Sequence, residues 1–193
     1  SMNAIPEFII LKNRETANNQ WYIYHKGLND GTNPEDYYVK LGASGNAAEA
    51  GDSGGSLFNS TAPTSTHFSV GTSSAINESG KGSLAILFAS VNGISECGFY
   101  DGNNSNSKAV SCGFQPRFIL IKNVTSTDDW MVFDSLRGIN NDVDGYDARL
   151  KLNISGPQSQ NKDWLSVNSN GFNLNTSDTG VNSDDRFIFY AHA

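Results

Sequence analysis

One segment of the chain carries the residue types of a serine nucleophile. Gly51-Asp52-Ser53-Gly54-Gly55 satisfies the Gly-x-Ser-x-Gly pattern of hydrolases and matches the nucleophile segment of serine proteases letter for letter. Such a protease needs a His and then an Asp well upstream. Only His25 precedes Ser53, and the interval is too short for the β-barrel that would carry them. We therefore expect Ser53 in an exposed loop, no catalytic residue, and a protein that is not an enzyme.

A second segment has oxygen-bearing side chains at the spacing of a calcium loop. Asn140, Asp142 and Asp144 are followed by Gly145, as at the first, third, fifth and sixth positions of such loops. The acidic residue expected at the twelfth position is replaced by Lys151, so an ordinary Asp-Gly turn is the favoured interpretation. Asn140, Asp142 and Asp144 remain the metal candidates, and calcium is the one cofactor left to test. The three histidines stand alone in sequence, which gives no support for zinc.

Two cysteines, Cys97 and Cys112, flank a strong turn signal, Asp101-Gly102-Asn103-Asn104. A hairpin centred on this turn would bring the two thiols close together. A disulfide and a pair of apolar strand thiols both remain open.

The tryptophans suggest sugar stacking or core packing. Trp21 and Trp130 follow similar apolar phrases within strand-like segments, and Trp164 precedes Leu165. Large aromatic side chains in apolar strands bury most of their surface in cores. Core packing is therefore our prediction for all three tryptophans.

Composition and charge narrow the classes of partner. The chain has 193 residues, of which 17% are charged, and glycine, serine and asparagine are abundant, a pattern of short strands joined by turns. It carries 13 basic and 20 acidic residues, for a net charge of −7. Nucleic-acid binding relies on clustered Lys and Arg, so we expect no nucleic-acid partner. No apolar stretch approaches the roughly 20 residues that span a bilayer, and we expect no membrane span.

The elements that would position these residues occur twice. The two series of phrases keep the same order, and their differences fall mainly in polar loops, which indicates a duplicated folding unit. The first series is Pro6-Glu7-Phe8-Ile9-Ile10-Leu11-Lys12-Asn13, Trp21-Tyr22-Ile23-Tyr24, Val39-Lys40-Leu41 and Phe68-Ser69-Val70. The second is Pro116-Arg117-Phe118-Ile119-Leu120-Ile121-Lys122-Asn123, Trp130-Met131-Val132-Phe133, Leu150-Lys151-Leu152 and Phe172-Asn173-Leu174.

Each series predicts five or six short antiparallel strands. Residues 8–12 and 118–122 are continuous apolar runs, typical of strands buried on both faces. Residues 68–70 and 172–174 alternate apolar and polar side chains, as half-buried strands do. We therefore predict an all-β protein of two tandem antiparallel β-sandwich units, jelly-roll-like and related by internal duplication. The expected units are residues 1–92 and 93–193.

The segment 93–112 has no counterpart before Pro6. A hairpin formed by this segment could pair with either unit. If every unit includes such a hairpin, we expect the first unit to come from a longer array of repeats.

Several phrases resemble a repeat in virion proteins of marine bacteriophages, including cyanophages. They are Gly113-Phe114-Gln115-Pro116-Arg117-Phe118-Ile119-Leu120-Ile121-Lys122, Trp130-Met131-Val132-Phe133-Asp134-Ser135-Leu136-Arg137-Gly138, Asn170-Gly171-Phe172-Asn173-Leu174 and Phe99-Tyr100-Asp101-Gly102-Asn103. The resemblance covers nearly the whole chain. It implies a structural or tail-fibre-like protein, located on the virion or otherwise extracellular, and it transfers no functional residue.

The resemblance and the polar loops together give the expected function. We expect a non-enzymatic appendage module for spacing, assembly or host-surface adhesion, with other virion proteins or a surface glycan as partners. The alternative is a carbohydrate-binding module that recognises a cell-surface glycan. Loops on a rigid scaffold commonly carry binding, and the candidates are residues 29–36, 43–60, 142–147 and 155–163. Because no exposed apolar stripe is evident in the sequence, we expect this chain to be monomeric or weakly associated in solution.

Overall fold

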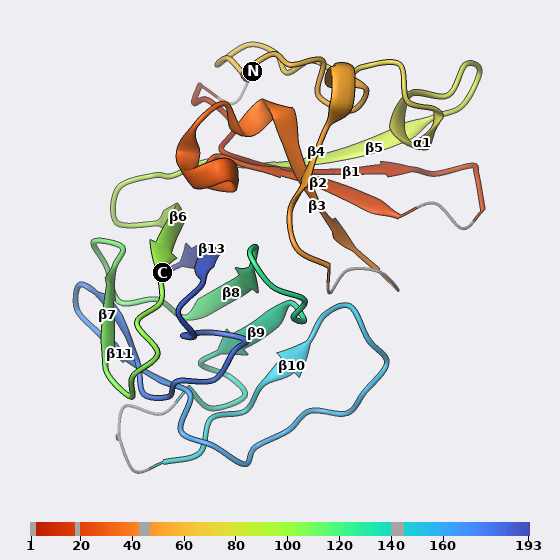
Figure 1. The fold of residues 1–193 in the computed structure, drawn as a ribbon. Helices are drawn as coiled ribbons and strands as arrows, with labels where there is room; N and C mark the ends of the chain where they lie inside the picture. Colours follow the sequence, from red (N-terminus) through yellow and green to blue (C-terminus); the bar gives the residue numbers. More distant parts are fainter. Residues whose placement is uncertain (1–2, 18–19, 43–46, 140–144) are drawn as a thin grey trace.

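The computed structural model describes residues 3–17, 20–42, 47–139 and 145–193. These residues form three antiparallel sheets joined by turns and short helical segments (Figure 1). The all-β class predicted from the sequence is confirmed.

The first sheet occupies one half of the molecule and has the order β4-β3-β2-β1-β5 (Figure 1). Its strands are β1 (Phe8–Asn13), β2 (Trp21–His25), β3 (Tyr37–Leu41), β4 (Ala50–Gly51) and β5 (Ser83–Phe88). Four short helical segments belong to the same half: η1 (Leu28–Gly31), η2 (Pro34–Asp36), η3 (Ser53–Gly55) and α1 (Ser74–Asn77).

The other half contains two sheets. The second sheet, β10-β9-β8-β13-β6, consists of β6 (Ser95–Asp101), β8 (Phe118–Asn123), β9 (Met131–Asp134), β10 (Leu150–Lys151) and β13 (Arg186–His192). The third sheet, β11-β12-β7, consists of β7 (Lys108–Ser111), β11 (Leu165–Asn168) and β12 (Gly171–Leu174).

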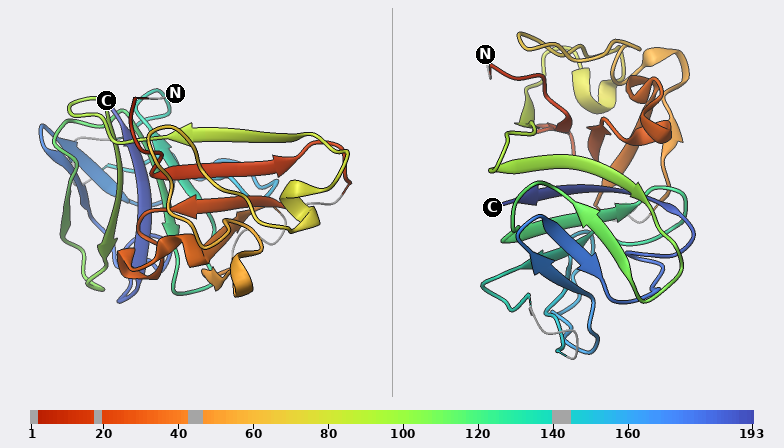
Figure 2. Two further views of the ribbon diagram at one scale, coloured as in Figure 1. Left: turned by 90° about the horizontal axis from the view of Figure 1, so that it is seen from above. Right: turned by 90° about the vertical axis from the view of Figure 1, so that its left-hand side faces the viewer.

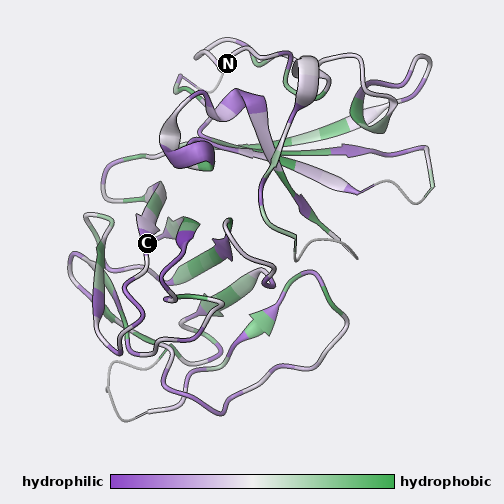
Figure 3. Ribbon diagram, in the orientation of Figure 1, coloured by the Kyte–Doolittle hydropathy of each residue, from purple (hydrophilic) through white to green (hydrophobic). Residues whose placement is uncertain are grey.

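The second sheet is buried on both faces. One face packs on the third sheet through a cluster that includes Phe133, Trp164 and Phe172. The other face packs on the first sheet through Phe8, Trp130 and Ile188, among others. Apolar residues are concentrated on the strands of these packed layers (Figure 3), and the strands of the first sheet run across those of the second (Figure 2). Residues 119–123 of β8 are buried throughout, as the continuous apolar run predicted.

The two halves share their central strand order and pairing register. The order β3-β2-β1-β5 in the first half corresponds to β10-β9-β8-β13 in the second. Tyr22 pairs with Lys40 as Met131 pairs with Lys151, which is the correspondence expected from the phrases. That a duplication produced this likeness remains our interpretation.

Among its described residues, the first half has no second sheet of its own. Residues 61–73 contain no strand, so the strand predicted at Phe68 and Val70 is wrong, whereas Phe172 and Leu174 lie in β12 as predicted. Loops and α1 cover this face of the first sheet and bury Leu57, Phe58 and Ile76 against it. In the second half, β12 pairs with both β7 and β11; no strand in the described part of the first half corresponds to β7.

The segment 93–112 belongs to the second half. β6 pairs with β13 and β7 pairs with β12. The predicted hairpin is wrong, because β6 and β7 lie in different sheets that pack face to face. Cys97 and Cys112 are free thiols in this arrangement.

Candidate functional site

Ser53, the candidate nucleophile, lies exposed at the start of η3, in a loop as expected. The histidines are engaged elsewhere. His25 bonds to Gly27 and Phe189, His67 to Thr64 and Thr66, and His192 to Tyr190. A serine nucleophile needs a base within hydrogen-bond reach. In the described part of the chain, Ser53 has none.

Asp52, beside Ser53, has a structural role. Its buried Oδ2 accepts hydrogen bonds from the backbone N–H groups of Leu57 (2.8 Å) and Phe58 (2.9 Å). Asp147 does the same in the second half, where its Oδ2 accepts from Trp164 (2.7 Å) and Leu165 (2.8 Å). The residue directly after Asp147 is Ala148, so this role of the aspartate does not depend on a neighbouring serine. The acidic residue of the Gly-Asp-Ser-Gly-Gly segment is therefore explained by the fold.

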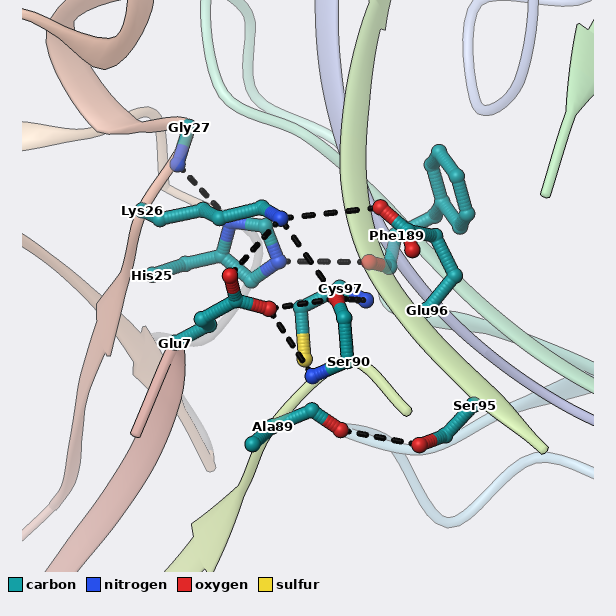
Figure 4. Close-up of polar contacts among 10 residues, drawn as sticks. All are labelled: Glu7, His25, Lys26, Gly27, Ala89, Ser90, Ser95, Glu96, Cys97 and Phe189. Atoms are coloured by element: carbon teal, nitrogen blue, oxygen red, sulfur yellow. Dashed lines mark hydrogen bonds and ion pairs between the residues drawn. The ribbon is translucent and has the colours of Figure 1, made fainter. Parts of the chain in front are cut away.

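A partly buried polar cluster lies where the first half meets β6 and β13 (Figure 4). At its centre, His25 Nε2 lies 3.2 Å from the carbonyl oxygen of Phe189, and His25 Nδ1 accepts a hydrogen bond from Gly27 N at 3.0 Å. These contacts fit a neutral ring that donates from Nε2. Complete burial lowers the pKa of His25 to about 3. A ring held neutral in this way is a poor proton acceptor.

The charged members of the cluster form an ion-pair network. Lys26 Nζ lies 3.1 Å from Glu7 Oε1 and 3.5 Å from Glu96 Oε1. Glu7 also accepts hydrogen bonds from the backbone N–H and the hydroxyl of Ser90. Burial by itself raises the pKa of Glu7, but the hydrogen bonds from Ser90 and Lys26 outweigh it and leave the pKa below its usual value. The network links β1 and β2 to β6.

Cys97 lies in the same cluster and is fully buried. Burial raises the pKa of its thiol to about 12, and the thiolate is the reactive form of cysteine. With a neutral His25 and a protonated Cys97, the cluster lacks the base and nucleophile of a cysteine hydrolase. Its geometry is that of a clamp between the two halves.

A groove at the junction of the two halves is the best candidate for binding. It has a volume of about 710 Å³ and is lined by Trp21, Leu41, Gly42 and residues 152–155. Leu152 and Ile154 are exposed apolar side chains on its wall. Asn153 is fixed there, because its Nδ2 donates to Asp129 (2.7 Å) and its Oδ1 accepts from Trp130 N (2.8 Å).

Trp21 departs from the core role predicted for it. Trp130 and Trp164 are buried as predicted, at 2% and 1% exposure, and Trp130 Nε1 donates to the carbonyl of Lys40 at 2.8 Å. Trp21 occupies the position equivalent to Trp130 but is half-buried and lines the groove, with Lys12 Nζ 5.8 Å from its ring centroid. Trp21 and Trp130 have the same position in the repeat, so the sequence pattern predicted the same burial for both and could not show this difference.

A second hollow of about 550 Å³ lies over the first sheet, beside Pro6, Leu87 and residues 64–68. Thr64 and Thr66 direct their hydroxyls to His67 Nδ1 at 3.1 and 3.0 Å. These groups satisfy one another within the loop and leave it with a polar rim.

The metal candidates Asn140, Asp142 and Asp144 lie outside the described residues. Across residues 3–17, 20–42, 47–139 and 145–193, no three His, Cys, Asp or Glu side chains gather as a metal site would require. None of the helices in the same ranges has the length and apolar character needed to cross a membrane.

The fold and these sites define an all-β protein of packed open sheets, with a polar clamp and a tryptophan-lined groove at its central junction. Residues 1–193 match a family described as a domain of unknown function (DUF7483), and the chain belongs to that family. No curated protein matches it. No solved structure matches it either.

Proposed function

We propose that this chain is a non-enzymatic structural module of a phage virion or appendage, where it serves spacing, assembly or adhesion. The supporting observation is the face-to-face packing of the two halves. Apolar side chains from both fill their junction, and the network of Glu7, Lys26 and Glu96 fastens it at one side. Two small units joined in this way form a stiff spacer, because relative motion would expose that apolar surface.

The side chains that could otherwise take part in catalysis have structural roles or are buried, which agrees with a structural module. Asp52 and Asp147 bind backbone amides, and His25 and Cys97 are buried and uncharged. The virion or another extracellular location, and partners among virion proteins, follow from the same proposal.

Mass spectrometry of phage particles purified from the source of the gene tests it. Peptides of this chain should persist in the particles through density-gradient purification. Their loss from the particles, together with their presence in the unassembled lysate fraction, would contradict the proposal.

Glycan binding in the groove is the second candidate. The observation that favours it is the half-buried Trp21, whose equivalent Trp130 is buried, in a groove that also presents the exposed Ser155. An exposed aromatic side chain offers a sugar ring a stacking surface, and neighbouring polar groups can fix its orientation.

A glycan array with the purified chain tests this candidate. Trp21→Ala should abolish the signal on any glycan that binds. Tyr146→Ala, which removes an exposed aromatic side chain away from the groove, should leave the signal unchanged. Equal loss in both variants, or no signal with the natural chain, would rule out the groove as a glycan site.

A further inference from the structure

β5 forms an open edge of the first sheet. It is the last strand in the order β4-β3-β2-β1-β5, and its pairing with β1 runs from Phe8↔Phe88 to Asn13↔Ser83 (Figure 1). The open side of β5 carries the row of backbone groups with which another strand can pair.

This edge lacks the usual protection against strand pairing. Its sequence, Ser83-Leu84-Ala85-Ile86-Leu87-Phe88, contains neither a charge nor a proline. Leu84 and Ile86 are 40% and 37% exposed. The outer strands of the same two sheets are different, because β4 and β10 have two residues each and β6 carries Glu96 and Asp101. Natural sheets blunt their edges with such short strands and charges.

The second half shows what fills the equivalent edge. β13 occupies the position of β5, since Lys12 pairs with Leu84 as Lys122 pairs with Ile188. The far side of β13 is covered by β6 along its whole length, from Arg186↔Asp101 to His192↔Ser95. Ile188 is 1% exposed, because it has β6 beside it and also packs against the first sheet, whereas its equivalent Leu84 is 40% exposed.

We propose that the edge of β5 is a docking site for an extended strand that pairs as β6 does on β13. The inference concerns this edge alone and holds whether or not the chain belongs to a virion. The register follows from the second half, where Phe99 lies opposite Ile188 and Cys97 opposite Tyr190. Transferred to β5, these positions lie opposite Leu84 and Ile86. The docked strand therefore carries apolar residues at two alternate positions, which cover the exposed side chains.

The backbone hydrogen bonds of β5 show which of its amides face the open edge, and exchange at these amides can be used to detect docking. Arg14 N donates to Gly82 O, so the even-numbered residues of β5 direct their backbone groups to β1. The alternate residues Ser83, Ala85 and Leu87 direct theirs to the open edge. Their amides are expected to exchange with solvent freely in the natural chain and slowly once a strand has docked.

The experiment supplies the strand at the spacing found in the second half. Residues 95–115 directly precede Pro116, so a copy of them is joined directly before Pro6 in place of residues 1–5. The control has the same extension with Gly98→Pro and Tyr100→Pro in the copy alone. These residues pair with Phe189 and Phe187 and direct their N–H groups to the neighbouring strand, so proline removes those donors from the ladder. Compared with the control, the extension is expected to slow exchange at Ser83, Ala85 and Leu87 roughly tenfold or more.

A free peptide of residues 91–103, added at millimolar concentration to the natural chain, gives a second arm that does not depend on the folding of the extended chain. It should slow the same three amides in proportion to its concentration. Unchanged exchange at these amides in both arms would overturn the proposal. A third outcome is slow exchange of these amides in the natural chain at high concentration, without peptide or extension, together with a dimer mass in sedimentation. This result would show that a second copy of the chain covers the edge, and it would overturn the proposed docking of a β6-like strand.

Discussion

Asp52 and Asp147 have the same role in the two halves, because one carboxylate oxygen of each binds two consecutive backbone amides. The two residues come from different points of the chain, since Asp52 follows β4 and Asp147 precedes β10. Each buried carboxylate thereby anchors the loop that returns over its own sheet. The amides belong to Leu57 and Phe58 in the first half and to Trp164 and Leu165 in the second, all of which are core residues. The hydrogen bonds fix the position at which these apolar side chains enter the core.

Removal of either carboxylate should destabilise the fold. Asp52→Ala and Asp147→Ala each leave two buried N–H groups without their acceptor, and we expect each to lower the free energy of unfolding by roughly 2–4 kcal/mol. Ser53→Ala should change it by less than about 0.5 kcal/mol, because Ser53 is exposed. Urea unfolding of the three variants measures this. A large effect of Ser53→Ala, or labelling of Ser53 by a fluorophosphonate, would contradict a purely structural role for the segment.

His25 should make the fold sensitive to mild acid. Its pKa is about 3 in the folded chain, against an ordinary value of about 6.5, so the unfolded chain binds the extra proton between these values. Stability therefore falls as pH decreases below 6.5. One such group predicts a loss of about 1.4 kcal/mol between pH 7.5 and 5.5, before the carboxylates begin to titrate.

Urea unfolding at a series of pH values tests the role of His25. His25→Gln should flatten the pH dependence in this window, even if it lowers the stability at every pH. His67→Gln serves as the control, because His67 is exposed and its loss should leave the dependence intact. An equal slope in the natural chain and in His25→Gln would assign the acid sensitivity to other groups.

The two thiols should differ in reactivity. Cys97 is fully buried with a pKa of about 12, while Cys112 is half-buried and its Sγ lies 3.4 Å from Phe114 O. We expect Ellman's reagent to modify Cys112 slowly in the folded protein and Cys97 only after unfolding, because the thiolate must be both formed and reached. Mass spectrometry of the modified peptides distinguishes the two sites. Rapid modification of Cys97 without loss of structure would show that the junction opens.

Trp21 and Trp130 should differ in energetic importance despite their equivalent positions. Trp130→Ala creates a cavity in the junction and removes the hydrogen bond to Lys40, at an expected cost of about 3–5 kcal/mol. Trp21→Ala removes a half-exposed side chain and its contact with Lys12, at an expected cost of roughly 1–2 kcal/mol. Thermal unfolding of both variants, with acrylamide quenching of the remaining tryptophans, provides the comparison. Equal costs would mean that Trp21 belongs to the core after all.

Much of the sheet architecture was predictable from local patterns. The phrases at 8–12 and 118–122 predicted buried strands, and the paired phrases at 39–41 and 150–152 predicted equivalent partners for β2 and β9. Strand formation depends on alternation and β-branching within a few residues, which the sequence displays directly. The exposed loop position of Ser53 was likewise predictable, because the neighbouring glycines Gly51, Gly54 and Gly55 favour a loop.

The tertiary structure alone decided the features that depend on distant partners. Phe68 and Val70 have the pattern of a strand but form none in a half that lacks a counterpart of β7 among its described strands. Trp21 and Trp130 share their local sequence context, and only the crossing of the two sheets buries one and leaves the other beside a groove. The burial of His25 and the exposure of Leu84 and Ile86 in β5 likewise depend on whether strands from elsewhere in the chain pack against these residues.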